Sequence, residues 1–571
     1  MDLRAAGILC FCLLCLAIFQ GAVSAATQGE FTPKRSVIFV LPKDWDDSLE
    51  EWARYRETEY QILRVQSVDS PYELRQTIIR VAENAKLPVT AVLLCGDAFG
   101  PIDPANPSVR PKTITPTFEL PTTVKLGPYT TPTLATDVLF GDLDNDECPD
   151  IAVGRLPAKN KADLRRMLHR SLQYEQSQTI GPWRDRIHAV AGVGGFGMIA
   201  DGAIESVTRR LLSEGIPDRF QLQMTYASLT SPYCPDPQKL TSSFISRINS
   251  GGLFWVDIGH GNVNRLDDFQ VGDELVPICT QDHVPQFQIQ DGAPIAVILA
   301  CFTGAFDARV DCFAEQLLSK DDGPIAVIAG SRVTMPYGMS QFSTELIEGC
   351  FQDRLETLGE MVLQSKRRIW QTNQSMPSEP EANTQSLAPD ADNPSVRFSQ
   401  FRQKLQKLIG QMAAALSPEG HDLTNERREH VRLMNLLGDP LLRIRQPKEL
   451  PMQCDATADA GESIEVTCEV PFPCRLKMEI ALSRDRLPAG IEAVRDFHGS
   501  DTQRDAMQRN YTKASDLTLV SSEQEVTPGT FRHQLLVPAD SRGRYVVRVY
   551  AYGENEWATG SKRITVQRIK K

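Results

Sequence analysis

The sequence predicts a three-layer α/β/α fold with mostly parallel strands, followed by a separate all-β sandwich. Short apolar runs rich in Val and Ile recur along most of the chain and alternate with stretches of helical periodicity. This strand–helix–strand order implies parallel strands joined by right-handed crossovers. After Pro447 the pattern changes to short alternating segments joined by Gly, Pro and Asp turns, which is typical of a β-sandwich.

The length of the chain predicts several domains. A chain of 571 residues exceeds what one hydrophobic core usually serves, so two or three domains are expected. The alternating patterns and composition shifts predict these parts: an N-terminal α/β subdomain at 34–180, a second α/β subdomain at 181–446 with a polar disordered insertion at 375–395, and a β domain at 447–571.

Composition and charge narrow the class of partner. A hydrophobic content of 41% and a charged content of 23% describe a soluble globular protein. The formal net charge of -12 argues against a nucleic-acid partner, because neutralising phosphates requires a basic face. The acidic balance is explained equally well by a solvated acidic surface.

The first 25 residues have the pattern of a signal peptide. Arg4 precedes an apolar run from Ala5 to Phe19, and small residues follow as far as Ala25. No second run of that length and apolarity follows, so no membrane span is expected in the mature chain. We therefore expect a secreted, cell-surface or periplasmic protein, with an uncleaved anchor as the alternative.

Reactive side chains follow two of the apolar runs. The run 252–258 ends in Gly259-His260-Gly261, and the run 293–300 ends in Cys301. Because parallel strands end at one sheet edge, where open α/β sheets bind ligands, His260 and Cys301 are expected to lie close together. A neighbouring imidazolium favours the reactive thiolate of a cysteine. The alternative for each residue alone is structural: a buried cysteine or a core histidine.

An acidic loop precedes one of the predicted strands. Asp142, Asp144 and Asp146 alternate in the way that loops present carboxylates to calcium. The EF-hand template is incomplete, because Glu147 stands where that template has glycine. Structural calcium is therefore one hypothesis for this loop, and a solvated acidic turn is the other. No cofactor is expected to be required for catalysis.

Six segments, taken in order, resemble the gingipain family of cysteine peptidases, whose fold is caspase-like. The resemblance covers about residues 34–446, and the trailing β module is similar to the immunoglobulin-like domain of that family. It implies a cysteine-type peptidase acting on protein or peptide substrates. The segments are 150–155, 259–261, 300–306, 312–315, 326–329 and 437–440.

The resemblance also implies roles for individual residues. Cys301 matches the nucleophile, and His260 matches its general base and acid. The backbone N–H groups of Gly261 and Cys301 would form the oxyanion hole. Asp150, the acidic residue directly before the Val-Gly-Arg strand, would orient the histidine. Any calcium would then depend on the three earlier aspartates.

Two residues after the last strand of the catalytic part are candidates for a specificity pocket. Arg332 and Tyr337 follow the apolar run 324–329, at the edge where a substrate pocket could form. We predict both as substrate-binding residues.

The leading functional hypothesis is a secreted cysteine endopeptidase that hydrolyses peptide bonds through a thioester. A sortase-like transpeptidase that processes surface proteins is an alternative, because an amine could capture the same thioester. The third hypothesis is a non-catalytic surface adhesion or binding protein whose β module binds a partner.

Overall fold

The computed structural model describes residues 33–99, 114–125, 129–177, 179–194, 214–372, 394–417, 420–494 and 496–567. The predicted signal peptide at 1–25 and nearly all of the predicted insertion at 375–395 lie outside these residues. Within the described ranges, no helix is both long and apolar enough to cross a membrane.

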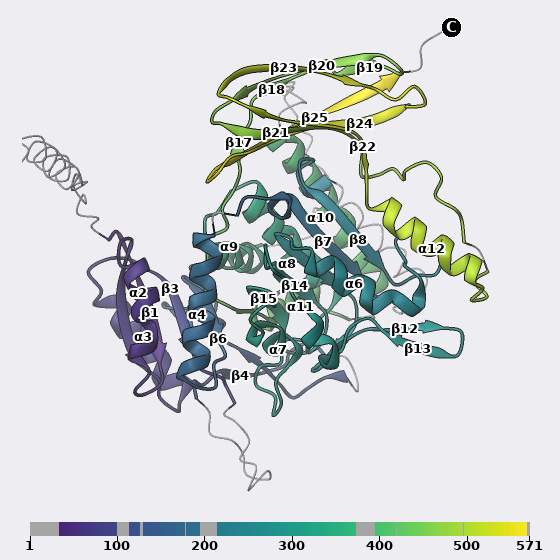
Figure 1. The fold of residues 1–571 in the computed structure, drawn as a ribbon. Coiled ribbons are helices and arrows are strands. Elements are labelled where there is room, and N and C mark those ends of the chain that lie inside the picture. The colour runs from purple at the N-terminus through teal and green to yellow at the C-terminus, as the bar shows by residue number, and fades with distance from the viewer. Residues whose placement is uncertain are drawn as a thin grey trace, which may run out of the picture.

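A ten-stranded sheet forms the middle layer of the larger part of the molecule (Figure 1). Its strand order is β2-β1-β3-β6-β16-β15-β14-β9-β7-β8. The inner strands are buried apolar runs, as parallel strands covered on both faces must be. The strands are β1 (Arg35–Leu41), β2 (Tyr60–Gln66), β3 (Val89–Cys95), β6 (Ala152–Leu156), β7 (Arg186–Ala191), β8 (Gln221–Tyr226), β9 (Phe254–Ile258), β14 (Ile295–Leu299), β15 (Ala326–Gly330) and β16 (Met434–Leu437).

The sheet consists of two parallel halves that run in opposite directions. They meet where β15 and β16 pair antiparallel, while the other neighbouring strands pair parallel. The sequence has helical periodicity over 425–437, but the last four of these residues form strand β16 instead. Helix α11 (Leu423–Leu433) stops first, because the apolar residues after it are buried in the middle of the sheet. The carboxyl ends of β9, β14 and β15 therefore share an edge with the amino end of β6.

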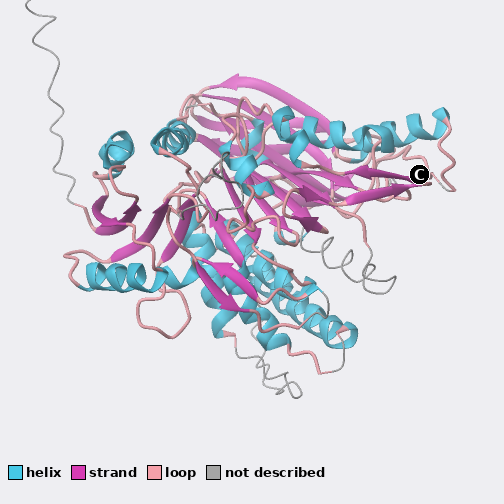
Figure 2. Cartoon of the chain, turned by 90° about the horizontal axis from the view of Figure 1, so that it is seen from below, coloured by secondary structure: helices cyan, strands magenta, loops and turns pink. Residues whose placement is uncertain are grey.

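Helices cover both faces of the sheet, which confirms the three-layer arrangement (Figure 2). On the half from β15 to β8, α6 and α7 pack on one face and α8, α9 and α11 pack on the other. On the other half, α2 and α4 cover one face and α3 covers the other. Helix α10 packs outside α8. The bounds are α2 (Glu50–Arg56), α3 (Pro71–Glu83), α4 (Lys161–Gln176), α6 (Leu240–Asn249), α7 (Phe313–Ser319), α8 (Pro336–Phe351), α9 (Leu358–Gln371) and α10 (Pro394–Leu416).

The C-terminal part is the predicted β-sandwich. One sheet has the order β17-β25-β24-β21-β22, with β19 also on β25, and the other has the order β18-β20-β23. Alternating buried residues of the two sheets form one core between them. The strands are β17 (Lys448–Glu449), β18 (Met452–Gln453), β19 (Thr457–Asp459), β20 (Ser463–Val470), β21 (Cys474–Leu482), β22 (Thr518–Val526), β23 (Gly529–Leu536), β24 (Gly543–Tyr552) and β25 (Trp557–Gln567).

The sandwich carries a helix that the sequence analysis did not predict. Helix α12 (Asp501–Ala514) follows β21 and reaches down beside β8 and α6 (Figure 1). The Tyr511 hydroxyl shares a 2.8 Å hydrogen bond with the Thr225 hydroxyl, and the Arg247 guanidinium lies 3.4 Å from the Tyr511 ring centroid. Met507 is buried in the α/β core. Helix α12 therefore fastens the sandwich to the α/β part.

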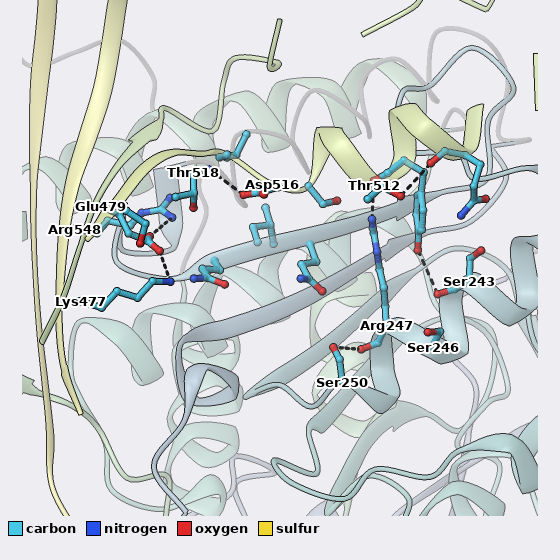
Figure 3. A pocket seen from close by; sticks show the side chains of 18 of the residues that line it. Ser243, Ser246, Arg247, Ser250, Lys477, Glu479, Thr512, Asp516, Thr518 and Arg548 are labelled. Carbon is cyan, nitrogen blue, oxygen red and sulfur yellow. Dashed lines mark hydrogen bonds and ion pairs between the residues drawn. The ribbon is translucent and has the colours of Figure 1, made fainter. Parts of the chain in front are cut away.

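A polar cavity of about 900 Å³ lies between β8, α6, α12 and the sandwich (Figure 3). Its walls are mostly serine, threonine and glutamine side chains, with the ion pair of Lys477 and Glu479 on the sandwich side. Arg548 Nη1 lies 3.9 Å from Glu479 Oε2. None of the predicted catalytic residues lines this cavity, so the cavity is separate from the predicted catalytic site.

Candidate active site

The sheet brings His260 and Cys301 to the same edge. Strands β9 and β14 are parallel neighbours, and Ile258 lies opposite Leu299. His260 and Cys301 each lie two residues beyond this last pair. The Gly259 N–H donates to the Leu299 carbonyl at 3.3 Å, so the pairing extends beyond the strand itself. Two residues that the sequence pattern singled out thus follow neighbouring strand ends.

Gly261 packs directly against the Cys301 segment. A Cβ atom at this position would lie 2.9 Å from the Cys301 carbonyl oxygen and 2.7 Å from Thr303 Cγ2, closer than real Cβ atoms approach other atoms. Gly261 then enters a small hairpin, in which β10 (Gly261–Asn262) pairs with β11 (Arg265–Leu266). The absence of a side chain therefore allows the histidine loop to lie on the cysteine turn.

Cys301 lies in a strained turn directly after β14. Phe302 has a φ of 59°, which for a bulky residue costs on the order of 1 kcal/mol. The Phe302 N–H donates to the Arg332 carbonyl at 3.0 Å, and this bond helps to hold the turn. The half-buried Cys301 Sγ accepts the Thr334 N–H at 3.4 Å. A donor at that distance stabilises negative charge on the sulfur.

The N–H groups proposed for an oxyanion hole lie at this contact. The Phe302 N–H is already bonded to Arg332, so it is not free to bind an oxyanion. In the described part of the chain, the N–H groups of Gly261 and Cys301 donate to no backbone acceptor outside the strand ladders. Their contribution to an oxyanion hole stays a prediction, and the close packing of the two residues supports it.

Asp267 lies beside His260, and the sequence analysis did not identify it. Its Oδ2 accepts the His260 N–H at 3.3 Å and the Val193 N–H at 3.0 Å. Burial raises the pKa of Asp267, and the nearby charge of His260 acts in the opposite direction. In the sequence, Asp267 and Asp268 follow His260 by seven and eight residues, a spacing that also fits an acidic surface turn.

Asp150 lies elsewhere on the sheet. It directly precedes β6, and β16, β15 and β14 separate β6 from the strand that carries His260. Four strand spacings amount to about 19 Å, too far for a carboxylate to touch the imidazole. The Asp150 Oδ2 instead accepts the Leu143 N–H at 2.9 Å. The structure does not bring Asp150 to His260, so the orienting role predicted for Asp150 rests on the resemblance alone.

The two predicted substrate-binding residues have structural partners. The Arg332 guanidinium pairs with the Asp307 carboxylate, with Nη1 2.8 Å from Oδ1, and donates to the Thr133 carbonyl at 3.0 Å. Tyr337 is 6% exposed and packs with Leu405 and other apolar residues between α8 and α10. Both side chains are thus engaged within the protein, and substrate binding by either residue stays a prediction.

The three aspartates of the acidic loop do lie together. One carboxylate oxygen from each of Asp142, Asp144 and Asp146 lies within 4.8 Å of the others. Arg75 Nη2 lies 2.9 Å from Asp142 Oδ2, and Asp142 Oδ1 accepts the Asn145 N–H at 2.8 Å. The spacing fits a cation, but Arg75 would compete with it for Asp142. Calcium at this loop stays a prediction.

Comparison with known families decides the relationship. Residues 31–445 match the model of peptidase family C25. The chain belongs to peptidase family C25. The gingipain-like resemblance inferred from six short segments is therefore confirmed, and the matched range agrees with the expected range of 34–446.

The C25 chain is also similar to individual gingipains. It is 23% identical over 308 residues to gingipain R2 of Porphyromonas gingivalis, covering 52% of this chain and 36% of that protein. It is 26% identical over 209 residues to gingipain R1 of the same species, covering 35% and 20%. The alignments thus span about a third or less of these curated relatives.

A solved gingipain structure also aligns with this C25 chain, at low sequence identity. The crystal structure of the Arg-specific cysteine proteinase gingipain R superposes with a TM-score of 0.46 and 16% identity, covering 94% of this chain and all of that one.

Proposed function

We propose that this member of family C25 is a cysteine endopeptidase whose nucleophile is Cys301. The observation that supports the proposal is the placement of His260 and Cys301 at adjacent strand ends, with Gly261 packed against the cysteine turn. Family membership supports the same class of reaction.

In the acylation step, the Cys301 thiolate attacks the carbonyl carbon of a peptide bond. A C–S bond forms, and the carbonyl electron pair moves to oxygen, where the N–H groups of Gly261 and Cys301 can bind it. The oxyanion then collapses and the C–N bond breaks. Protonated His260 gives its proton to the departing amine, which leaves an acyl thioester on Cys301 and a neutral imidazole.

In the deacylation step, water attacks the thioester carbonyl. Neutral His260 takes a proton from the water, the C–S bond breaks, and a carboxylic acid and the Cys301 thiolate–imidazolium pair result. Every atom and proton comes from the substrate, water or these two side chains, so no cofactor takes part. We further propose export of the chain, protein or peptide substrates, and no nucleic-acid partner.

Labelling with a peptidyl electrophile that alkylates thiols tests the nucleophile. Among the described cysteines, Cys301 and Cys454 are the two that are not fully buried. Cys301→Ala is expected to abolish both labelling and peptide cleavage, and Cys454→Ala serves as the matched control that retains both. Unchanged cleavage by Cys301→Ala would overturn the proposal.

An added amine acceptor separates hydrolysis from transpeptidation. The proposal expects hydrolysed product, and a ligated product as the main species would assign transpeptidation instead. A wild-type protein that labels with no peptidyl electrophile and cleaves no peptide of a library would support the binding hypothesis.

A further inference from the structure

The His260 loop is held by one carboxylate that joins two strand ends. Asp267 follows the β10–β11 hairpin, and its Oδ2 accepts N–H groups from both His260, after β9, and Val193, after β7. Its Oδ1 accepts the Asp268 N–H at 3.1 Å, which fixes the carboxylate orientation. The carboxylate thus accepts three hydrogen bonds from backbone N–H groups.

The Asp267 carboxylate lies close to the backbone of two glycines. A Cβ atom on Gly192 would lie 2.7 Å from Asp267 Oδ2, and a Cβ atom on Gly259 would lie 3.4 Å from it. Two glycines on neighbouring strand ends therefore make space for this group. A solvated acidic turn would not require such a close approach of two backbones.

A second buried carboxyl lies on β9, three residues before His260. Asp257 is 3% exposed, and its Oδ2 has no hydrogen-bond partner among the described residues. Burial, together with the charge of Asp267, raises the pKa of Asp257 well above its usual value. Asp257 is therefore harder to ionise than an ordinary aspartate.

Two positively charged groups act on Asp267. Arg265 lowers the pKa of Asp267 through its charge, but its guanidinium pairs with the Asp268 carboxylate. His260 makes the larger electrostatic contribution to Asp267. His260 and Arg265 are therefore the two positive groups whose charges lower the pKa of Asp267.

We propose that Asp267 is the positioning residue of His260: it fixes the histidine backbone to the end of β7 and supplies the negative charge that favours the imidazolium. The inference rests on the proposed Cys301–His260 pair. It assigns to Asp267 the orienting role that the family resemblance implied for Asp150. Asp267 acts through His260 and does not touch the substrate in this assignment.

The test is the pH dependence of kcat/KM in Asp267→Asn, which keeps the shape and removes the charge. Without that charge the imidazolium is lost more easily as pH rises, so the alkaline limb should move to a pH lower by about 1. At the optimum of the wild type, kcat/KM should fall by about tenfold. Asp268→Asn, the same change one residue away, should leave the alkaline limb in place.

A second readout does not depend on activity. In Cys301→Ala protein labelled with ¹³C-histidine, the His260 ring signal should titrate at lower pH once Asp267→Asn is added. An unmoved signal together with an unmoved alkaline limb would overturn the inference, and so would displacement of the limb by Asp150→Asn but not by Asp267→Asn. If Cys301→Ala still cleaves peptides, the proposed function fails, while the titration still reports on Asp267.

Discussion

Gly261 and Cys301 touch backbone to backbone, since a Cβ atom on Gly261 would lie 2.9 Å from the Cys301 carbonyl oxygen. In Gly261→Ala, the histidine loop must therefore move away from the cysteine turn. A displacement of about 1 Å at reacting groups costs about 100-fold in rate, so kcat/KM should fall by about 100-fold. Steady-state kinetics at several peptide concentrations would measure this change.

A matched control is available on α10. A Cβ atom on Gly410 would meet no atom within 4 Å, so Gly410→Ala should leave kcat/KM unchanged. Equal activity of Gly261→Ala and wild type would show that the contact of this loop with Cys301 has no part in the reaction.

The ion pair of Arg332 and Asp307 is expected to support the cysteine turn. Both side chains are mostly buried, at 13% and 12% exposure, and the Arg332 carbonyl accepts the Phe302 N–H. Arg332→Ala leaves Asp307 without its partner and should lower the free energy of unfolding by about 2 kcal/mol. In a double-mutant cycle with Asp307→Ala, urea unfolding should give a coupling of about 1–2 kcal/mol.

The same variants distinguish support of the turn from substrate binding. If Arg332 bound substrate directly, Arg332→Ala would change which peptides are cleaved and would couple weakly to Asp307. We expect instead a common loss of kcat/KM for all peptides of a library. A selective change in cleavage preference, with no coupling between Arg332 and Asp307, would indicate that Arg332 binds substrate directly.

Asp185 should make stability depend on pH at the junction with the sandwich. It ends the short helix Pro182–Asp185, is fully buried, and accepts the Tyr552 hydroxyl at 3.2 Å. Burial raises the pKa of Asp185 from 3.8 to about 7, against the lowering effect of Arg219. The stability that the neutral carboxyl gives is thus fully present below about pH 4 and is lost as pH rises through 7.

Asp185→Asn removes this titration and keeps an acceptor for Tyr552. The free energy of unfolding of the variant, minus that of the wild type, should therefore increase between pH 5 and pH 8. A tenfold change in a proton-binding constant corresponds to about 1.4 kcal/mol, so the increase should reach a few kcal/mol. Denaturant unfolding at both pH values would measure it, and a difference that is constant with pH would contradict the assignment.

The strand ends that carry His260 and Cys301 could be predicted because the signal is local. Each follows a buried apolar run that stops at glycine or at a small residue, and parallel neighbours then share an edge. The approach of Gly261 to Cys301 follows from the same pairing. A local sequence pattern cannot predict a contact that depends on where a later loop folds back.

Asp267 is such a contact, because the β10–β11 hairpin folds it back onto His260. The strand β16 was missed for another reason: its four residues, three of them apolar, directly follow a helix and look like its last turn. Because β16 lies between β6 and β15, it places Asp150 one strand further from His260. Helix α12 is held in place by tertiary contacts of Met507 and Tyr511, which no local sequence pattern predicts.

The most direct test of the proposed reaction is to trap the acyl-enzyme. Wild-type protein mixed with a peptide ester and quenched in acid should carry one acyl group, which peptide mapping places on Cys301 and hydroxylamine removes as a thioester. Cys454→Ala should give the same adduct, and Cys301→Ala should give none. An acyl group on another residue, or turnover of the ester by Cys301→Ala, would contradict the proposal.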